Sequence, residues 1–302
     1  MKVGVVLPLG EDEGLGRPAG YAAVRDLALQ AEEAGFDSIW LYDHLLYRFP
    51  DRPPAGVWEG WTFLAALAEA TRRPELGTIV LCIAFRNPAV LAKMAATFDE
   101  VSAGRLILGL GAGWHRPEFD AFGFPFDHKV DRFAEALQII CPLLREGRVD
   151  FAGRYYQAPD CELRPRGPRP GGPPILVAAA GPRMLRLTAR HADCWNTAWL
   201  GRPTLLAERR AGLDAACAEV GRDPATLAVT VGVIVAYPPE GAAPPAGGDP
   251  AKVLAGSAEE VAAGLRAYRE QGVAHVICNC VPNDAASLAR LADALRVYRA
   301  LP

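Results

Sequence analysis

The most constraining feature of this chain is an apolar, strand-like run that recurs eight times, with helical patterns between the runs. Each run is almost continuously apolar, which is typical of parallel strands covered on the outside by helices. The runs are Val3–Leu7, Ser38–Tyr42, Gly77–Ala84, Arg105–Leu110, Pro174–Ala179, Cys194–Ala198, Leu227–Val235 and Ala274–Cys280. Alternating strands and helices with short connections predict parallel pairing through right-handed crossovers. Eight such units predict an α/β fold, the (β/α)8 or TIM barrel.

The helical segments carry their own start and stop signals. The apolar face between Tyr21 and Ala34 has helical spacing, and Gly35 follows it at a position where a left-handed residue commonly ends a helix. Asn87-Pro88 has the composition of a helix start. Ser257 with Glu260 predicts a capping box.

The chain is longer than a minimal barrel, so part of it must be inserted. A barrel of this type needs about 250 residues, and this chain has 302. We interpret residues 1–302 as one barrel domain with insertions near 114–129, 148–173 and 238–250. The second insertion has the composition of a hairpin followed by an extended linker. The third is a low-complexity run of Pro, Gly and Ala.

Composition argues against several classes of function. The formal net charge is −3, without a dominant basic patch, which argues against a nucleic-acid partner. No apolar run approaches the roughly 18 residues of a membrane span. The seven cysteines are scattered and odd in number, which favours a reducing compartment, the cytoplasm, over a disulfide framework. Cys278 and Cys280 lack a second pair at zinc-site spacing, so we expect no metal site.

Barrel enzymes place their active sites after the carboxyl ends of the strands, so these positions supply the candidates. Asp43 and His44 follow the second strand. A histidine there can exchange a proton near neutral pH, and Asp43 could orient it. The alternative is that Asp43 caps a local turn and His44 fills a gap in the packing.

The third and fourth strands lead into two further candidate stretches. Cys82 and Ile83 lie either against a bound ligand or in an ordinary buried strand end. Gly111 and Gly113 belong to a turn in which the backbone can approach a ligand closely. Trp114 stands where a dinucleotide-binding fingerprint requires glycine, so the motif is not that fingerprint.

The fifth and sixth strands supply a candidate anion site and a candidate ring contact. The small residues Ala179, Ala180 and Gly181 precede Pro182 at a helix start, and such helix N-termini bind phosphate. The next two residues, Arg183 and Met184, belong to the same run, and Arg183 can add charge; an ordinary turn with a solvated arginine is the alternative.

Trp195 and Asn196 follow on the sixth strand. They can line a planar ring, although Trp195 could equally belong to the core. Of the remaining histidines, we expect structural roles for His191 and His275. His115 and His128, which lie in the first insertion, can only contact substrate.

Three ordered blocks of the sequence resemble the bacterial luciferase-like family of flavin and deazaflavin oxidoreductases. The first begins at Gly104 with GRLILGLGAGWHRPEFDAFGFPF and continues to Leu137. The second is PPILVAAAGPRMLRLTARHADCWN, residues 173–196, and the third is RNPAVLAKMAATFDEVSAGR, residues 86–105. The resemblance extends over nearly the whole chain. It implies a barrel with insertions, usually a homodimer, and a tricyclic cofactor at the mouth of the barrel.

The resemblance also bears on the cofactor. Family members that use FMN are mostly monooxygenases, whereas members that use the deazaflavin coenzyme F420 move a hydride without activating O2. Asp43-His44 matches a pair that contacts the deazaflavin or substrate in the F420 group. Cys82-Ile83 matches a bulge with a non-prolyl cis peptide behind the ring, and Ala179–Met184 matches the phosphate loop. These matches favour an F420-dependent oxidoreductase acting on a small organic molecule. The alternative is an FMN-dependent monooxygenase, which would need a flavin reductase as partner.

One departure from the family pattern limits the choice of substrate. F420-dependent sugar-phosphate dehydrogenases carry a catalytic glutamate directly after the glycine-rich turn, where this chain has Trp114. We therefore expect no sugar-phosphate oxidation. Glu59 is a candidate replacement carboxylate, or else a charge that stabilises a helix N-terminus. A non-catalytic carrier of the cofactor is a further class of function, but such relatives lack parts of the barrel and this chain has all eight units.

Overall fold

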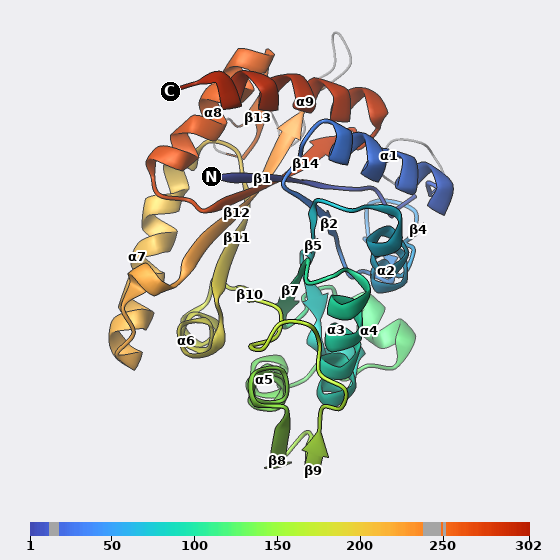
Figure 1. Cartoon of the computed structure of the whole chain (residues 1–302), viewed down its shortest axis with the longest axis vertical. Coiled ribbons are helices and arrows are strands. Elements are labelled where there is room, and N and C mark those ends of the chain that lie inside the picture. Colours follow the sequence, from blue (N-terminus) through green and yellow to red (C-terminus); the bar gives the residue numbers. More distant parts are fainter. Residues whose placement is uncertain (12–17, 238–248, 250–251) are drawn as a thin grey trace.

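Eight parallel strands close into a barrel surrounded by helices (Figure 1). The computed structural model describes residues 1–11, 18–237, 249 and 252–302. The barrel strands are β1 (Lys2–Val6), β2 (Ser38–Leu41), β5 (Glu75–Thr78), β7 (Leu106–Gly111), β10 (Ile175–Ala178), β11 (Cys194–Leu200), β12 (Ala228–Ala236) and β14 (His275–Val281). Parallel pairing of β7 with β10 closes the ring that begins with β1 and β14. The TIM-barrel prediction is confirmed.

A helix follows each barrel strand along the chain. These helices are α1 (Tyr21–Glu33), α2 (Gly60–Ala70), α3 (Pro88–Val101), α5 (Lys129–Glu146), α6 (Pro182–His191), α7 (Leu206–Val220), α8 (Ala258–Glu270) and α9 (Ala285–Ala300). The end signals act as predicted: Gly35 has a left-handed φ, Asn87 caps α3, and Ser257 with Glu260 forms the capping box of α8.

The core has two layers, because successive residues of a strand point to opposite faces. One layer lies between the strands and the helices and contains most of the buried aliphatic side chains. The other fills the lumen of the barrel with Val6, Trp40, Ile79, Ile107, Leu176 and Ile277. Trp40 is fully buried there, and Gly77 provides the space, since a Cβ at Gly77 would lie 2.2 Å from the Trp40 ring.

The third predicted strand is interrupted. β5 ends at Thr78, and a short β6 (Leu81–Cys82) and a 3-10 turn (Ile83–Phe85) follow. Thr78 ends the ladder because its Oγ1 donates to Gly109 O at 2.9 Å and accepts from Gly109 N at 3.0 Å. A non-prolyl cis peptide lies at Ile79–Val80, between β5 and β6, and a second lies at Ala198–Trp199 in β11. The placement of a cis peptide at Cys82-Ile83 was therefore wrong.

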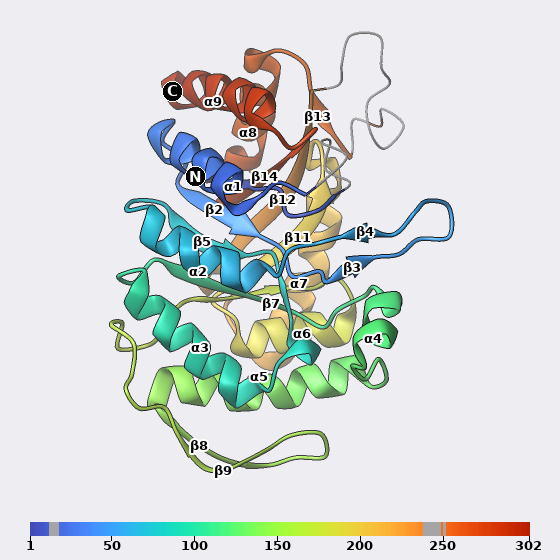
Figure 2. The same ribbon diagram turned by 90° about the vertical axis from the view of Figure 1, so that its right-hand side faces the viewer.

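The insertions lie at separate places on the outside of the barrel (Figure 2). The short helix α4 (Arg116–Phe122) occupies the first predicted insertion. The second contains the antiparallel hairpin of β8 (Arg148–Ala152) and β9 (Gln157–Glu162), which lies beyond α5. The third, residues 238–250, lies outside the described residues except for Asp249. A further hairpin, β3 (Leu46–Tyr47) with β4 (Ala55–Gly56), was not anticipated and projects on the same side as α4.

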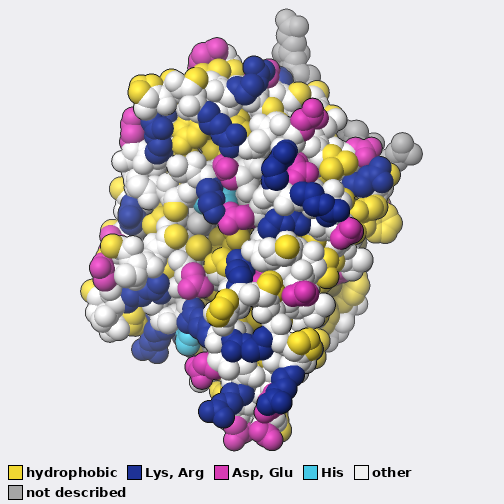
Figure 3. All heavy atoms as spheres, in the orientation of Figure 1, with side chains coloured by type: hydrophobic (Ala, Val, Ile, Leu, Met, Phe, Trp, Pro, Cys, Tyr) yellow, Lys and Arg dark blue, Asp and Glu magenta, His cyan; other side chains and the backbone are white. Residues whose placement is uncertain are grey.

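The surface carries charges of both signs. On the face shown in Figure 3, Lys and Arg side chains are interspersed with Asp and Glu. Among the described residues, no helix is both long and apolar enough to cross a membrane.

Candidate active site

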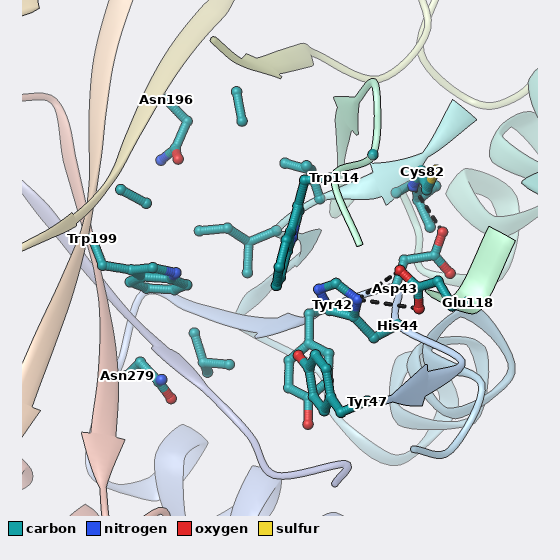
Figure 4. A pocket seen from close by; sticks show the side chains of 17 residues that line it. Tyr42, Asp43, His44, Tyr47, Cys82, Trp114, Glu118, Asn196, Trp199 and Asn279 are labelled. Carbon is teal, nitrogen blue, oxygen red and sulfur yellow. Dashed lines mark hydrogen bonds and ion pairs between the residues drawn. The ribbon is translucent and has the colours of Figure 1, made fainter. Parts of the chain in front are cut away.

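A cavity of about 390 Å³ lies at the mouth of the barrel, among the carboxyl ends of the strands and the insertions (Figure 4). Its volume falls within the range of about 300–1,000 Å³ that is typical of ligand sites. The lining residues are Val6, Tyr42, Asp43, His44, Tyr47, Ile79, Val80, Leu81, Cys82, Gly113, Trp114, Glu118, Ala178, Asn196, Ala198, Trp199 and Asn279. Five of them, namely Asp43, His44, Cys82, Gly113 and Asn196, are candidates from the sequence.

His44 is held by Glu118 and not by Asp43. Its Nδ1 lies 3.0 Å from Glu118 Oε1, and Glu118 Oε2 also accepts from the backbone N–H of Leu45 at 3.0 Å. Helix α4 carries Glu118, whose exposed fraction is only 2%. The carboxylate fixes the imidazole through one nitrogen, which leaves Nε2 as the nitrogen that can meet a ligand in the cavity.

Asp43 is engaged elsewhere, so its predicted role in orienting His44 was wrong. Its carboxylate accepts two hydrogen bonds from the Arg86 guanidinium, at 2.7 and 2.9 Å, and one from Cys82 N at 2.8 Å. Burial raises the pKa of Asp43, and the bonds from Arg86 and Cys82 act in the opposite direction. Asp43 therefore ties the end of β2 to the chain after the bulge, and it supports the wall of the cavity.

Glu59 does not line the cavity. It caps α2, where Oε2 accepts from Thr62 N at 2.7 Å, and it also pairs with Arg86. Although burial acts to raise its pKa, the bonds from Thr62 and the charge of Arg86 lower the pKa of Glu59 below its ordinary value. Of the two alternatives from the sequence, a catalytic carboxylate or a charge at a helix N-terminus, the structure supports the second.

Aromatic rings surround His44. The ring centroid of Trp114 lies 5.4 Å from that of His44 in an edge-on arrangement, and the centroid of Tyr47 lies 4.6 Å away. His115 packs beside them, and its Nε2 accepts from Arg48 N at 3.1 Å. Burial lowers the pKa of His115, so this ring acts as a neutral acceptor that holds the β3–β4 hairpin against α4.

One wall of the cavity is formed by backbone that lies unusually close to its neighbours. Gly113 lines the cavity, and a Cβ there would lie 2.6 Å from Cys82 Sγ. Gly111 is not among the lining residues; a Cβ there would lie 2.6 Å from Cγ2 of Val80, which does line the cavity. Burial raises the pKa of the Cys82 thiol to about 12, so Cys82 remains a neutral thiol and not a nucleophile. Ile83 is buried in the core layer beneath the helices and does not reach the cavity.

The two candidates on β11 face opposite sides of the strand. Asn196 points into the cavity, where its Nδ2 donates to Thr230 Oγ1 at 2.9 Å. Its Oδ1 is buried and has no hydrogen-bond partner among the described residues. Trp195 belongs to the core layer outside the barrel and donates to Ala179 O at 2.9 Å, so it does not edge the cavity as predicted.

The predicted phosphate loop lies at the start of α6, outside the lining of the cavity. Gly181 is the N-cap residue and makes no side-chain capping bond, and Pro182 opens the helix. Ala180, Gly181 and Arg183 are exposed. Arg183 pairs with Asp131 of α5, while Met184 packs against the core and Ala179 is buried in it. A helix N-terminus of this kind can accept an anion, in which case Arg183 would exchange Asp131 for the ligand.

Several residues of the cavity escaped the sequence analysis. Glu118 lies within the quoted family block, four residues after Trp114, but its pairing with His44 spans 74 positions in the sequence. Trp199 lies in β11, three residues after the candidate Asn196. The pairing of β11 with β12 shifts register between Thr197 and Leu200, the stretch that contains Trp199. Asn279 lies within β14, and Tyr42 directly follows β2. Both belong to apolar runs, so neither was recognised as a candidate from the sequence.

Comparisons with known proteins identify relatives of this chain. The family model described as luciferase-like monooxygenase matches residues 1–244. An F420-dependent glucose-6-phosphate dehydrogenase of Kineococcus radiotolerans is 34% identical over 284 residues, covering 90% of this chain and 75% of that protein. The pyrimidine monooxygenase RutA of Methylobacterium radiotolerans is 34% identical over 246 residues, covering 74% of this chain and 61% of that protein.

A solved structure shares the fold over the full length. It is an F420-dependent secondary alcohol dehydrogenase in complex with an F420-acetone adduct, with a TM-score of 0.80, 20% identity and 99% coverage of both chains. From the matched family model, the relatives and the barrel, we conclude that this chain belongs to the luciferase-like monooxygenase family.

Proposed function

We propose that this protein is an oxidoreductase that uses coenzyme F420 to transfer a hydride to or from a small organic substrate. The observation that carries the proposal is the His44–Glu118 pair at the mouth of the barrel, where one imidazole nitrogen is fixed at 3.0 Å from a buried carboxylate. The named activities of several relatives support the choice of cofactor, because F420-dependent dehydrogenases occur repeatedly among them.

The residues of the cavity fit a tricyclic ring. The pyrimidine edge of a deazaflavin carries an N–H between two carbonyl groups, and the unpartnered Oδ1 of Asn196 is an acceptor that such an N–H would satisfy. Glycine at position 113 adds no side chain to this wall, since a Cβ there would lie 2.6 Å from Cys82 Sγ. The loop from Ala179 to Arg183 would hold the phosphate of the cofactor.

The mechanism follows from the position of His44. The bound deazaflavin supplies the centre that accepts or gives the hydride. When an alcohol carbon loses a hydride, its hydroxyl must also lose a proton, and His44 Nε2 takes that proton. The Glu118 carboxylate then stabilises the imidazolium through Nδ1–H. In the opposite direction, His44 returns the proton to the carbonyl oxygen as the hydride arrives.

The runner-up is an FMN-dependent monooxygenase that receives reduced flavin from a reductase. Its support is the similarity to the pyrimidine monooxygenase RutA. The two candidates differ in the ring that binds and in the use of O2. Titration of the purified protein with F420 and with FMN, followed by tryptophan fluorescence, separates them.

Saturable binding of F420 at micromolar concentration, with FMN binding at least tenfold weaker, is the expected result. Anaerobic turnover of F420 with a panel of alcohols and ketones would then establish hydride transfer. Preferential binding of FMN together with consumption of O2 would overturn the proposal.

We also propose, from the family resemblance, that the protein is a homodimer in the cytoplasm and that residues 1–302 form one domain. Light scattering should give twice the chain mass of 32.3 kDa. A single cooperative unfolding transition would support the one-domain interpretation.

A further inference from the structure

The charges of the side chains that line the cavity bear on the kind of substrate that it can bind. Of the 17 lining residues, Asp43 and Glu118 are the only ones with a charged side chain, and both are acidic. Neither Lys nor Arg lines the cavity in the part of the chain that the structure describes. An anionic group on a substrate would therefore find no cation to pair with in this lining.

Three cations that lie close to lining residues are already engaged. Arg86 bonds to Asp43 and pairs with Glu59. Lys129 Nζ donates to Gly113 O at 3.1 Å and lies 4.0 Å from the centroid of the Phe126 ring. Arg209 bonds to Thr197 Oγ1 and to Ala198 O on β11. Moving any of these side chains to a phosphate or carboxylate would break the contacts that shape the wall.

Two indole rings contribute accessible apolar surface to the cavity. Trp114 and Trp199 are among the most exposed large apolar side chains of the described residues, at 59% and 37%, yet both line the cavity. Figure 4 shows Trp114 beside His44 and Trp199 across the cavity from it. Large apolar groups exposed within a cleft mark a surface that gains free energy when a ligand covers it.

The position of Trp199 is built into the neighbouring strand. A Cβ at Gly232 of β12 would lie 2.9 Å from the Trp199 ring, so glycine at this position makes room for the indole. Trp114 is fixed from the other side by His115 and Phe49, whose ring centroids lie 5.0 and 6.3 Å away. The two rings are therefore placed by packing and do not depend on a ligand.

From these observations we infer that the substrate is an uncharged alcohol or ketone that carries an aromatic or similarly planar apolar group, which packs against Trp114 and Trp199. The inference rests on the proposed function for the reacting group but not for the recognition surface. A cavity of about 390 Å³, shared with the cofactor ring, further restricts the substrate to a compact molecule. The lining offers no Lys or Arg to bind the phosphate of a phosphorylated sugar, which argues against such a substrate.

The test compares three ketones on the F420-loaded protein by calorimetry. Acetophenone carries the neutral aromatic group, 4-acetylbenzoate adds one negative charge to the same ring, and acetone lacks the ring. We expect acetophenone to bind at least about tenfold more tightly than either of the others. Equal or tighter binding of 4-acetylbenzoate, or no measurable binding of acetophenone, would overturn the inference.

Substitutions of the tryptophans test whether these rings are responsible for the preference for acetophenone. Trp114→Leu and Trp199→Leu should each weaken acetophenone binding about tenfold, whereas Trp58→Leu, which removes an exposed indole outside the cavity lining, should leave it unchanged. Trp199→Lys should shift the preference toward 4-acetylbenzoate, because it places a cation in the lining. A preference that is the same in all four variants would contradict recognition by these rings.

Titration of the same preparations with F420 keeps the two proposals distinguishable. If F420 binds but the ketones are not discriminated, the substrate class is wrong and the proposed cofactor stands. If F420 does not bind, the proposed function fails. In that case the same three ketones, measured on the FMN-loaded protein, would still test whether the cavity prefers an uncharged aromatic ligand.

Discussion

The lumen of the barrel contains a histidine at each end, and comparing the two shows what separates a structural from a chemical imidazole. At the closed end, His275 begins β14, and its Nε2 lies 2.7 Å from Ser38 Oγ. That hydroxyl accepts from Trp40 Nε1 at 2.6 Å. Burial lowers the pKa of His275 to about 3. This imidazole is neutral and belongs to a buried hydrogen-bond network.

At the open end, the partner is a carboxylate and not a hydroxyl. Glu118 holds His44 through Nδ1, and the ring lies in the wall of the cavity between Tyr47 and Trp114. A carboxylate favours the protonated ring, whereas a buried hydroxyl next to an indole does not. The same side chain is therefore a fixed packing element at the base and a proton carrier at the mouth.

The largest expected effect comes from removing the proton carrier at the mouth. His44→Gln keeps a polar group near Glu118 but cannot take up a proton, so turnover should fall about 10²- to 10⁴-fold. F420 affinity and the free energy of unfolding should change little, because the ring is not part of the core. Steady-state kinetics, cofactor titration and urea unfolding check this. Equal losses of turnover and cofactor affinity would show that His44 only lines the cavity and does not transfer a proton.

The second effect is expected at the closed end and should appear in stability alone. Gly77→Ala would place a Cβ 2.2 Å from the buried Trp40 ring. Overpacking of this kind lowers the free energy of unfolding by about 1–3 kcal/mol.

The matched control for this substitution is Gly171→Ala, since a Cβ there would meet nothing within 4 Å. It should stay within about 0.5 kcal/mol of the parent. Urea unfolding of both variants measures the difference. A loss of turnover in folded Gly77→Ala protein would show that the two ends are coupled.

The third prediction sharpens the role of the carboxylate at the mouth. Glu118→Gln retains the shape and an acceptor for Leu45 N but removes the charge that stabilises protonated His44. Turnover should fall about tenfold, equivalent to about 1.4 kcal/mol. The loss should appear in kcat, while the affinity for F420 stays close to that of the parent; steady-state kinetics and cofactor titration measure both. Unchanged turnover would mean that Glu118 serves only to hold the hairpin.

Most of the fold could be read from the sequence because it depends on repetition. All eight barrel strands were recognised from their apolar runs, and Gly35, Asn87 and Ser257 mark helix ends through local backbone chemistry. The β3–β4 hairpin was missed because its paired segments are two residues each, too short for an alternating pattern.

The site could be read only in part, because its partners meet through space. His44 was identifiable from its position after a strand, but Glu118 reaches it from an insertion helix 74 residues away. Trp195 and Asn196 are adjacent in sequence, yet one faces the helices and the other the lumen. Strand register decides which of two adjacent residues faces the lumen, and a continuous apolar run does not reveal that register.

The smallest effect concerns the pH dependence of stability at the closed end. The pKa of His275 is about 3 in the folded protein against 6.5 ordinarily, so between these values the unfolded chain binds a proton that the folded chain does not. The free energy of unfolding should therefore fall as the pH drops below about 6.5, by up to about 1.4 kcal/mol per pH unit from this group. In His275→Gln that contribution disappears, so the variant should lose less stability between about pH 7 and about pH 5 than the parent does. His128→Gln, at an exposed histidine, should behave like the parent. If His275→Gln loses as much stability as the parent over this interval, the base of the barrel is not the buried hydrogen-bond network that distinguishes it from the mouth.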